Sequence, residues 1–420
     1  MRVVHLSHSD SFGGAANFAL RIIDSLNSIE VDNTFLVSSK IGRLSNTHVV
    51  SPQGNNLLNF VKAKISQISD RQIRKLEKTE IPMDKSPNLF GAINASTLNK
   101  YDCVHFHYIN GGLISISQIG KISKPILWTM PDMWPFLGGE HYLTHTDNVR
   151  FLSGYLNSNR NKLDLGIDIS KYIYKQKVNN FKDLNLVAPS SWLANQAKKS
   201  FLFKNKSIEV IPPPIDFQIF KPIGSLRFRK FHSIDEDDFV IGFLGGTQIR
   251  KGWKFVYDLI LYGLNEDKWK FILGGVGRSK YPSLPSSVII LGTVNSQEEM
   301  LEFYSSIDVL LVPSIQEAFG LVAQEAQSCG VPVIVFSETG CSEIVKDSYS
   351  GFVVKNRSVN DLVKPLEFLH NLSKVQRINM SADIRLRSQK LWDKSNIAEK
   401  YREKYREIIS SSENFKKEGA

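Results

Sequence analysis

Two glutamates, Glu317 and Glu325, stand eight residues apart just after an apolar run that ends at Val312. The first falls in the turn after a predicted strand, and the second falls in the helix that follows. Eight helical steps would separate them by about 12 Å, which exceeds the roughly 5–9.5 Å between the paired carboxylates of glycoside hydrolases. Two carboxylates at this distance suit an elongated polyhydroxy ligand such as a nucleotide sugar, each binding hydroxyls of a different ring. The plainer alternative is a solvent-facing pair of helix glutamates.

A basic pair, Arg250 and Lys251, follows the strand-like run Phe239–Leu244 and the turn Gly245-Gly246. Two cations and exposed backbone amides at the carboxyl end of a strand suit a diphosphate. An ordinary surface pair of basic residues is the alternative. The spacing therefore makes these four residues candidates for binding the phosphates of a nucleotide.

A second glycine-rich turn, Gly13-Gly14, follows the run Val3–Leu6 and precedes an amphipathic stretch. Backbone amides and the N-terminus of a helix would stabilise a phosphate there, although a plain tight turn is the alternative. The spacing is not that of the dinucleotide fingerprint, which argues against a Rossmann dehydrogenase. Both glycine-rich turns follow the first strand of their half of the chain, so we expect them to face each other across one cleft.

Short apolar runs alternate with stretches of helical period along the whole chain, which predicts α/β structure with parallel sheets covered by helices. The length of 420 residues suits two large domains. The run Pro212-Pro213-Pro214 cannot continue a helix or a central strand. We therefore expect two doubly wound, Rossmann-like domains at residues 1–211 and 225–394, a hinge at 212–224, and a C-terminal helix at 395–420 that packs back on the N-terminal domain. The predicted strands are Val3–Leu6, Thr34–Ser38, Cys103–His107, Ile126–Met130, Leu186–Ala188, Phe239–Leu244, Lys270–Leu273, Val288–Leu291, Val309–Val312 and Val333–Phe336.

The amino-acid composition limits the classes of protein to which this chain can belong. Apolar residues make up 42% and charged residues 22%, as in ordinary globular proteins. No run of 18 apolar residues and no signal peptide is evident, which predicts a cytoplasmic protein. The three cysteines, Cys103, Cys329 and Cys341, are too scattered for a disulfide framework or a thiolate zinc site, and we expect buried, reduced thiols.

The formal net charge of +10 favours an anionic partner. Without a dense basic tract interleaved with aromatics, nucleic acid is not expected, and an anionic membrane or a phosphorylated substrate is the better interpretation. The segment Phe60–Glu80 has apolar residues near helical spacing among basic ones, including Lys62, Lys64, Arg71 and Arg74. It suits a helix on a membrane surface, with a solvated helix covering the first sheet as the alternative.

The motifs together resemble those of the retaining nucleotide-sugar glycosyltransferases of family GT4, whose fold is GT-B, two Rossmann-like domains facing across a cleft. The segment from Glu317 to Glu325 resembles the E-x7-E motif of that family. Further matches occur in the same order as in the family, over most of residues 1–375. They are Phe12-Gly13-Gly14-Ala15, Val104-His105-Phe106-His107, Trp128–Phe136, Ala188–Leu193, Val210–Pro222, Arg250-Lys251-Gly252 and Gly330–Val333.

The resemblance implies a role for each matching residue. Glu317 would contact hydroxyls of the donor sugar, Glu325 the ribose, and Lys251, with Arg250 as second cation, the diphosphate. The remaining implied donor-binding residues are Gly13, Gly14, Gly245, Gly246, Thr293, Phe319, Gly320 and Leu321, and those on the acceptor or sugar side are His107 and Asp132. Relatives usually need no catalytic metal and no cofactor, and they transfer a hexose with retention of configuration by front-face attack.

One departure from the family pattern bears on activity: Pro131 stands where relatives commonly have an active-site histidine. His107 or His141 would be the substitutes. The leading hypothesis is a cytoplasmic, peripheral glycosyltransferase that extends a surface polysaccharide on a lipid-linked or glycan acceptor at the inner face of the plasma membrane. The alternative is a catalytically impaired nucleotide-sugar-binding partner or regulator with the same fold. The sugar, the base, the acceptor, the linkage and the oligomeric state stay open.

Overall fold

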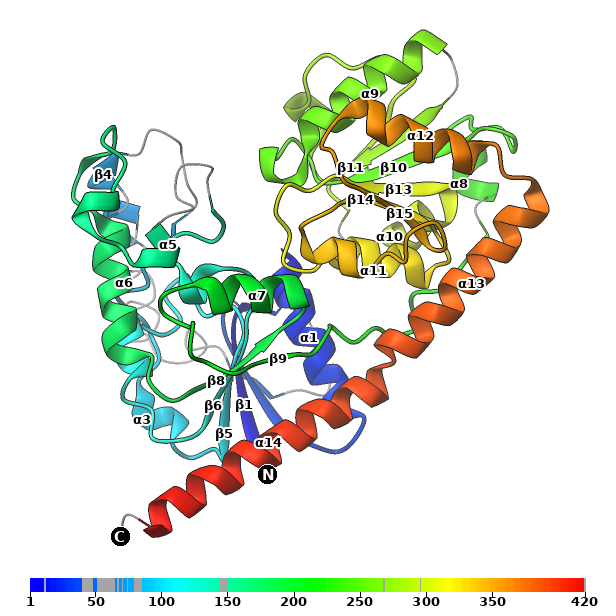
Figure 1. The fold of residues 1–420 in the computed structure, drawn as a ribbon. Coiled ribbons are helices and arrows are strands. Elements are labelled where there is room, and N and C mark those ends of the chain that lie inside the picture. The colour runs from blue at the N-terminus through cyan, green and yellow to red at the C-terminus, as the bar shows by residue number, and fades with distance from the viewer. Residues whose placement is uncertain are drawn as a thin grey trace. The chain divides into compact units, whose positions relative to one another are not determined.

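The protein forms two compact units, each built around its own parallel sheet (Figure 1). The first unit contains residues 1–214 and 394–420, and the second contains residues 215–393. The computed structural model describes residues 1–10, 13–39, 48–50, 65, 68–69, 71–73, 75–78, 85–143, 150–224, 226–266, 269–294 and 296–418. Most of the segment Phe60–Glu80, including Lys62, Lys64 and Arg74, lies outside these residues. Within the described part, no helix is both long and apolar enough to cross a membrane.

The sheet of the first unit has seven parallel strands in the order β3-β2-β1-β5-β6-β8-β9. Its central strands are buried on both faces, which explains their nearly continuous apolar sequences. The chain order reverses between β1 and β5, so the loops that follow these two strands border the position where doubly wound sheets bind ligands. The strands are β1 (Arg2–Ser9), β2 (Asp32–Ser39), β3 (His48–Val50), β5 (Cys103–Phe106), β6 (Ile126–Thr129), β8 (Leu184–Ala188) and β9 (Ile208–Val210).

Helices and one small hairpin complete the first unit. The strands β4 (Glu77–Lys78) and β7 (Leu165–Gly166) pair antiparallel, apart from the main sheet. The helices are α1 (Gly13–Asn27), α3 (Ala95–Leu98), α4 (Ile116–Ile119), η1 (Trp134–Phe136), α5 (Arg150–Ser153), η2 (Asn157–Asn159), α6 (Ile169–Asn180), α7 (Ser191–Lys199) and α14 (Lys394–Glu418).

Helix α14 belongs to the first unit although it ends the chain. It packs against α1 (Figure 1). The hydroxyl of Tyr405 lies 2.7 Å from Nδ1 of His105 in β5, and that of Tyr401 lies 3.2 Å from Oγ1 of Thr129 in β6. All four side chains are buried. The tyrosines at helical spacing thus cover the sheet and satisfy buried polar atoms within it.

The sheet of the second unit has six parallel strands in the order β12-β11-β10-β13-β14-β15. The order reverses between β10 and β13, which places the ligand-binding end of this sheet at the loops after those two strands. The strands are β10 (Val240–Leu244), β11 (Lys270–Gly274), β12 (Ile289–Gly292), β13 (Val309–Val312), β14 (Val333–Phe336) and β15 (Gly351–Val354). The helices are α8 (Leu226–Phe231), η3 (Ile249–Lys251), α9 (Trp253–Glu266), η4 (Arg278–Lys280), α10 (Gln297–Ser306), α11 (Leu321–Ser328), η5 (Gly340–Glu343), α12 (Val359–His370) and α13 (Lys374–Trp392).

The structure confirms the predicted α/β class with two doubly wound sheets. Each predicted strand overlaps an observed one and, except for the first, ends within one residue of it; β1 continues three residues beyond the predicted end at Leu6, to Ser9. The strands β3, β4, β7, β9 and β15 were not predicted. These five have only two to four residues, too few for a periodic pattern to show. The three cysteines are free and buried, as expected.

Candidate active site

The loops after β10 and β13 are joined by backbone contacts in the second unit. The amide of Ile315 donates to the carbonyl oxygen of Arg250 at 2.8 Å. Gly252, at φ +78°, permits this approach, because a Cβ at that position would overlap the carbonyl oxygen of Pro313. The fold thereby brings Arg250 and Lys251 beside the turn that carries Glu317.

The carboxylate of Glu317 is the centre of this arrangement. Its Oε2 accepts a hydrogen bond from Nζ of Lys251 and lies 3.3 Å from Nη1 of Arg250. The same guanidinium nitrogen donates to the carbonyl oxygen of Gln316 at 2.7 Å. Burial acts to raise the pKa of Glu317, but the charges and hydrogen bonds of Lys251 and Arg250 outweigh it and hold the pKa below its ordinary value. The three residues predicted as catalytic therefore form one charged cluster with a net positive charge.

The turn between Glu317 and α11 packs tightly on η5. The amide of Gly340 donates to the carbonyl oxygen of Glu317 at 2.8 Å. Gly320 precedes α11 at φ +101°, and a Cβ there would overlap the sulfur of Cys341. Phe319 is buried, whereas Leu321 at the start of the helix is half-buried. Because the first amides of a helix have no partner within it, this turn offers donors to a ligand oxygen.

Glu325 lies about one turn into α11 and is hydrogen-bonded by a neighbouring helix. Its Oε2 accepts a hydrogen bond of 2.6 Å from the hydroxyl of Tyr304 in α10. Glu325 is 5% exposed and Glu317 is 8% exposed, so the alternative of two solvent-facing helix glutamates is wrong. Buried carboxylates are retained where they have partners, and Tyr304 is a partner that the sequence pattern did not reveal.

The turn after β10 corrects one expectation. The amides of Gly245 and Gly246 both donate to the carbonyl oxygen of Gly274 at 3.2 Å, so these amides are not exposed as predicted. They are engaged because the carboxyl end of β11 lies directly beside the turn. The cations of η3, rather than these amides, are therefore the groups of this loop that stay candidates for binding phosphate. Thr293, after β12, is exposed.

In the first unit, a hydrogen-bonded chain of three side chains follows β6. Oδ2 of Asp132 lies 2.7 Å from Nδ1 of His141, and Nε2 of His141 lies 2.8 Å from Oγ of Ser86. An amide-to-carbonyl bond of 2.7 Å from Ser86 to Gly139 aligns the two segments. His141 also stacks on Tyr108, which follows β5. Asp132 and His141 are buried, and Ser86 is half-buried at the carboxyl end of the sheet. Ser86 was missed because nothing near it in the sequence indicates this contact.

His107, predicted on the acceptor or sugar side, lies in the core at 2% exposure. Its Nε2 lies 3.0 Å from Nδ1 of His5. Burial lowers the pKa of His5 to about 4 and holds the pKa values of His105 and His107 well below the ordinary value, so these rings are uncharged. Their nitrogens lie within 4.8 Å of one another, but both nitrogens of His105 already contact hydroxyls. His141 is therefore better placed than His107 to substitute for the histidine that Pro131 replaces.

Gly13 and Gly14 form the exposed start of α1, with Gly13 at φ +83°. They follow β1 at the carboxyl end of the sheet, as the sequence predicted. Ser11 and Phe12 of the same turn lie outside the described residues. The role of both glycines in binding a ligand stays a prediction.

Comparison with known proteins shows a family match for the second unit and similar relatives for much of the chain. Residues 225–385 match the family described as glycosyl transferases group 1. A D-inositol 3-phosphate glycosyltransferase of Paenarthrobacter aurescens is 24% identical over 327 residues, which cover 71% of this chain and 72% of the relative. Against several further relatives of the same name, the match spans 64–65% of their length.

Solved structures extend the likeness to the whole chain. Anabaena Alr3699/HepE in complex with UDP-glucose has a TM-score of 0.65 at 16% identity and covers 98% of this chain and 100% of its own. WaaG, a glycosyltransferase involved in lipopolysaccharide biosynthesis, has a TM-score of 0.62 at 15% identity, with coverages of 95% and 98%. The chain thus has the GT-B fold, and its second unit is a group 1 glycosyl transferase domain. The predicted GT-B fold is confirmed, and the match of residues 225–385 agrees with the predicted family.

Proposed function

We propose that the protein transfers a hexose from a nucleotide diphosphate sugar to an acceptor hydroxyl, with retention of configuration and without a catalytic metal. The observation that carries this proposal is the cluster of Glu317, Lys251 and Arg250 beside the buried Glu325, at the reversal point of the second sheet. A nucleotide sugar supplies matching groups: a diphosphate for the cations and two sets of hydroxyls for the carboxylates.

The cluster accounts for the chemistry as follows. The acceptor oxygen forms a new bond to the anomeric carbon while the bond from that carbon to the diphosphate oxygen breaks. The electron pair leaves with the nucleoside diphosphate, which takes the acceptor proton on the face where the acceptor enters. Lys251 and Arg250 stabilise the negative charge that builds on the leaving group. In this proposal their two charges take the place of a metal ion.

The two glutamates have separate tasks in this mechanism. Glu317 binds hydroxyls of the transferred sugar, and its hydrogen bonds strengthen as the ring becomes cationic. Glu325, oriented by Tyr304, binds the ribose throughout the reaction. Gly320 and Leu321 supply amides, and Thr293 lies toward the base.

We assign the acceptor to the first unit. Asp132 holds His141 with its proton on Nδ1, so that Nε2 accepts from Ser86 and the oxygen of Ser86 is free to accept from a hydroxyl of the acceptor. The curated relatives act on D-inositol 3-phosphate and WaaG functions in lipopolysaccharide biosynthesis, according to their names. A polyhydroxy acceptor, either a glycan or a lipid-linked sugar of surface polysaccharide synthesis, fits both this site and these relatives.

We place the enzyme in the cytoplasm, as a peripheral protein at the inner face of the membrane. Three free, buried cysteines agree with a reducing compartment, and the net charge of +10 has the sign that anionic lipids attract. The second candidate function, a nucleotide-sugar-binding partner without transferase activity, rests on Pro131 alone.

A screen of nucleoside diphosphates and nucleotide sugars by thermal stabilisation tests the proposal. A ligand at 100 times its dissociation constant stabilises the folded state by about 2.7 kcal/mol. We expect one base to be preferred, and the preferred sugar nucleotide to be consumed in the presence of a polyhydroxy acceptor. Stabilisation without turnover for any acceptor would favour the binding partner, and no stabilisation by any nucleotide would reject both functions.

A further inference from the structure

The hairpin of β4 and β7, with α5, η2 and α6, presents apolar side chains to solvent on the first unit. We call this region, the described residues among 65–78 together with residues 150–178, the hairpin lobe. Leu163, Leu165 and Ile167 are 62%, 62% and 59% exposed. Leu165 and Ile167 alternate along an extended segment, so they lie on the same side of it. Further exposed apolar side chains of the lobe are Ile65, Ile68, Leu76, Leu152, Leu156 and Tyr172.

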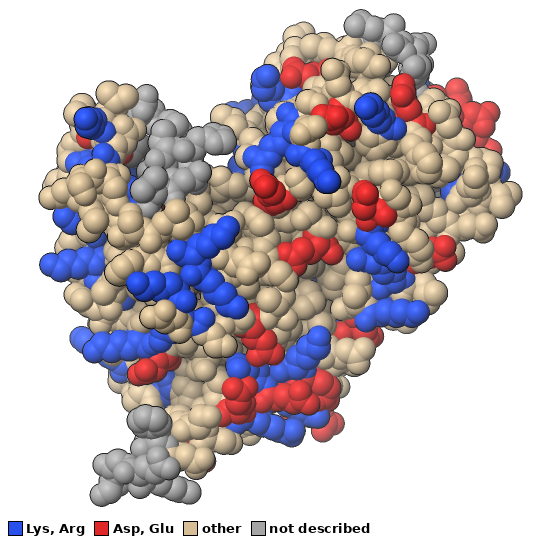
Figure 2. All heavy atoms as spheres, in the orientation of Figure 1, with Lys and Arg blue, Asp and Glu red and all other residues tan. Residues whose placement is uncertain are grey.

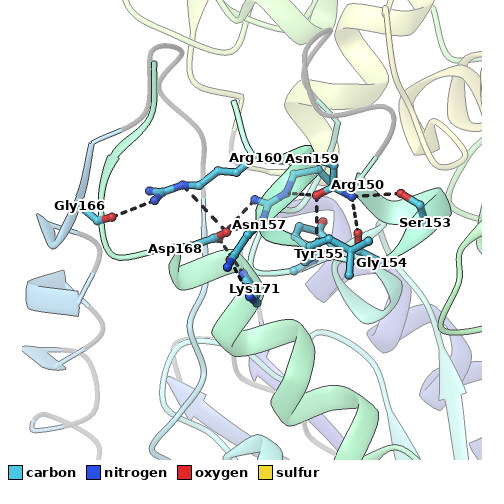
Figure 3. Close-up of polar contacts among 12 residues, drawn as sticks. Arg150, Ser153, Gly154, Tyr155, Asn157, Asn159, Arg160, Gly166, Asp168 and Lys171 are labelled. Carbon is cyan, nitrogen blue, oxygen red and sulfur yellow. Dashed lines mark hydrogen bonds and ion pairs between the residues drawn. The ribbon is translucent and has the colours of Figure 1, made fainter. Parts of the chain in front are cut away.

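A polar network links the segments of the lobe between Arg150 and Lys171 (Figure 3). Both carboxylate oxygens of Asp168 bind the guanidinium of the buried Arg150, at 2.5 and 3.3 Å. Arg160 donates to the carbonyl oxygens of Leu165 and Gly166, on the strand that carries the apolar residues. Such bidentate, charge-assisted contacts are the strong kind. These contacts therefore hold the backbone that carries the exposed leucines.

Asn159 extends the same network to the start of the lobe. Its side-chain amide donates to the carbonyl oxygen of Gly154 at 2.6 Å, and its oxygen accepts from the amide of Leu156 at 3.0 Å. The exposed Leu156 is thus anchored through its own backbone. Several large exposed apolar side chains on one hydrogen-bonded framework indicate an interaction site.

The charge around these apolar residues is positive. Arg71, Lys75, Lys162 and Lys175 are exposed. Among the side chains that the structure describes in the lobe, the acidic ones are Asp164 and Asp168. Both are half-buried, and Asp168 is paired with Arg150. In Figure 2 the surface over α5 and α6 shows blue side chains among tan ones. Apolar tips among lysines and arginines are typical of segments that lie in a bilayer interface.

We propose that the hairpin lobe binds an anionic phospholipid bilayer, with Leu163, Leu165 and Ile167 inserted among the headgroups and acyl chains. The basic side chains around them bind lipid phosphates. A second copy of the chain fits less well, because an isologous contact would set these cations against each other. This inference rests on the proposed membrane-linked acceptor and names the surface that meets the membrane.

Co-sedimentation of the full chain with vesicles tests the inference. Vesicles of phosphatidylcholine alone are compared with vesicles that also contain phosphatidylglycerol, at physiological salt. We expect the unmodified protein to prefer the anionic vesicles. The triple variant Leu163→Ser, Leu165→Ser, Ile167→Ser should lower the partition coefficient at least about tenfold, because three apolar side chains no longer enter the bilayer.

A matched control comes from the second unit, where Val375 and Ile378 on α13 are 66% and 59% exposed. Val375→Ser with Ile378→Ser should leave vesicle binding unchanged. A charge variant, Lys162→Gln with Lys175→Gln, should weaken binding to anionic vesicles only. Equal loss in the control, or no preference of the unmodified protein for anionic vesicles, would overturn the inference. So would a concentration-dependent dimer that the triple variant abolishes, since the lobe would then bind another copy.

Thermal stabilisation by the preferred nucleotide, measured on the same variants, separates this inference from the proposed function. We expect all vesicle-binding variants to keep it. Nucleotide binding without vesicle binding would reject the lobe assignment alone, whereas vesicle binding without nucleotide binding would reject the transferase alone.

Discussion

Replacing Glu317 by glutamine tests the charged cluster at the centre of the second unit. The substitution keeps the size of the side chain and one acceptor oxygen but removes the negative charge that Lys251 and Arg250 share. Those two cations then lie beside a neutral amide. The stability of the fold and the binding of phosphates should respond in opposite directions.

The expected loss of stability follows from the contacts. A hydrogen bond to a charged group contributes about 1.5–3 kcal/mol, and Glu317 accepts from two cations. Both cations are partly exposed, at 24% and 29%, which weakens each pair through solvent screening. The glutamine also keeps one bond. We expect Glu317→Gln to lower the free energy of unfolding by about 1–2 kcal/mol at neutral pH.

The pH dependence identifies the source of that loss. Because the pKa of Glu317 is depressed in the folded protein, its contribution is present above the ordinary glutamate pKa and is lost as the pH falls through the folded value. The difference between the two proteins should therefore be full above about pH 5 and should shrink below about pH 4.

Urea unfolding at several pH values measures this difference. Glu403→Gln on α14 is the control, because Glu403 is exposed and removal of its charge should change stability by less than about 0.5 kcal/mol. Calorimetry should show nucleoside diphosphate bound at least as tightly by Glu317→Gln as by the unmodified protein, while turnover falls. A stability difference that does not vary with pH, or weaker diphosphate binding, would refute the reasoning.

Three further substitutions extend the test. Tyr304→Phe removes the buried 2.6 Å hydrogen bond to Glu325 and should cost about 1.5–3 kcal/mol in urea unfolding, with weaker nucleotide binding in calorimetry; unchanged affinity would mean that Glu325 does not bind the ribose. Lys251→Ala should weaken nucleoside diphosphate by about 1.5 kcal/mol more than nucleoside monophosphate, and equal losses in calorimetry would place the ammonium away from the distal phosphate. Tyr405→Phe leaves a buried nitrogen of His105 without its hydroxyl partner and should cost about 1–3 kcal/mol; a neutral result in thermal unfolding would show that α14 is held by apolar contacts alone.

The local features of the chain were predictable from the sequence. The central strands of both sheets appear as apolar runs in the sequence because they are buried on both faces. The triple proline at 212–214 lies where the chain passes between the two units. Glu317 and Glu325 follow β13 at a fixed spacing in the sequence. That spacing places the first in the turn after the strand and the second in α11.

Contacts between distant segments were not predictable in the same way. Tyr304 meets Glu325 across two helices, and Ser86 meets His141 across 55 positions of sequence. The hydrogen bonds that the amides of Gly245 and Gly246 donate depend on where the carboxyl end of β11 lies. No local periodicity records such pairings, because they arise from the order and register of strands.

The sequence by itself determined the α/β class and the positions of Arg250, Lys251, Glu317 and Glu325 just after their strands, since each rests on periodicity or on local spacing. The order of its motifs carried the resemblance to the family. Tertiary structure alone decided that both glutamates are buried, that His107 lies in the core while His141 joins Asp132 and Ser86, and that the leucines of the hairpin lobe face solvent. Burial is a property of what other segments cover. An apolar residue on a short strand has the same local pattern whether its face meets a sheet or is left open, and only the packing of the whole unit distinguishes the two.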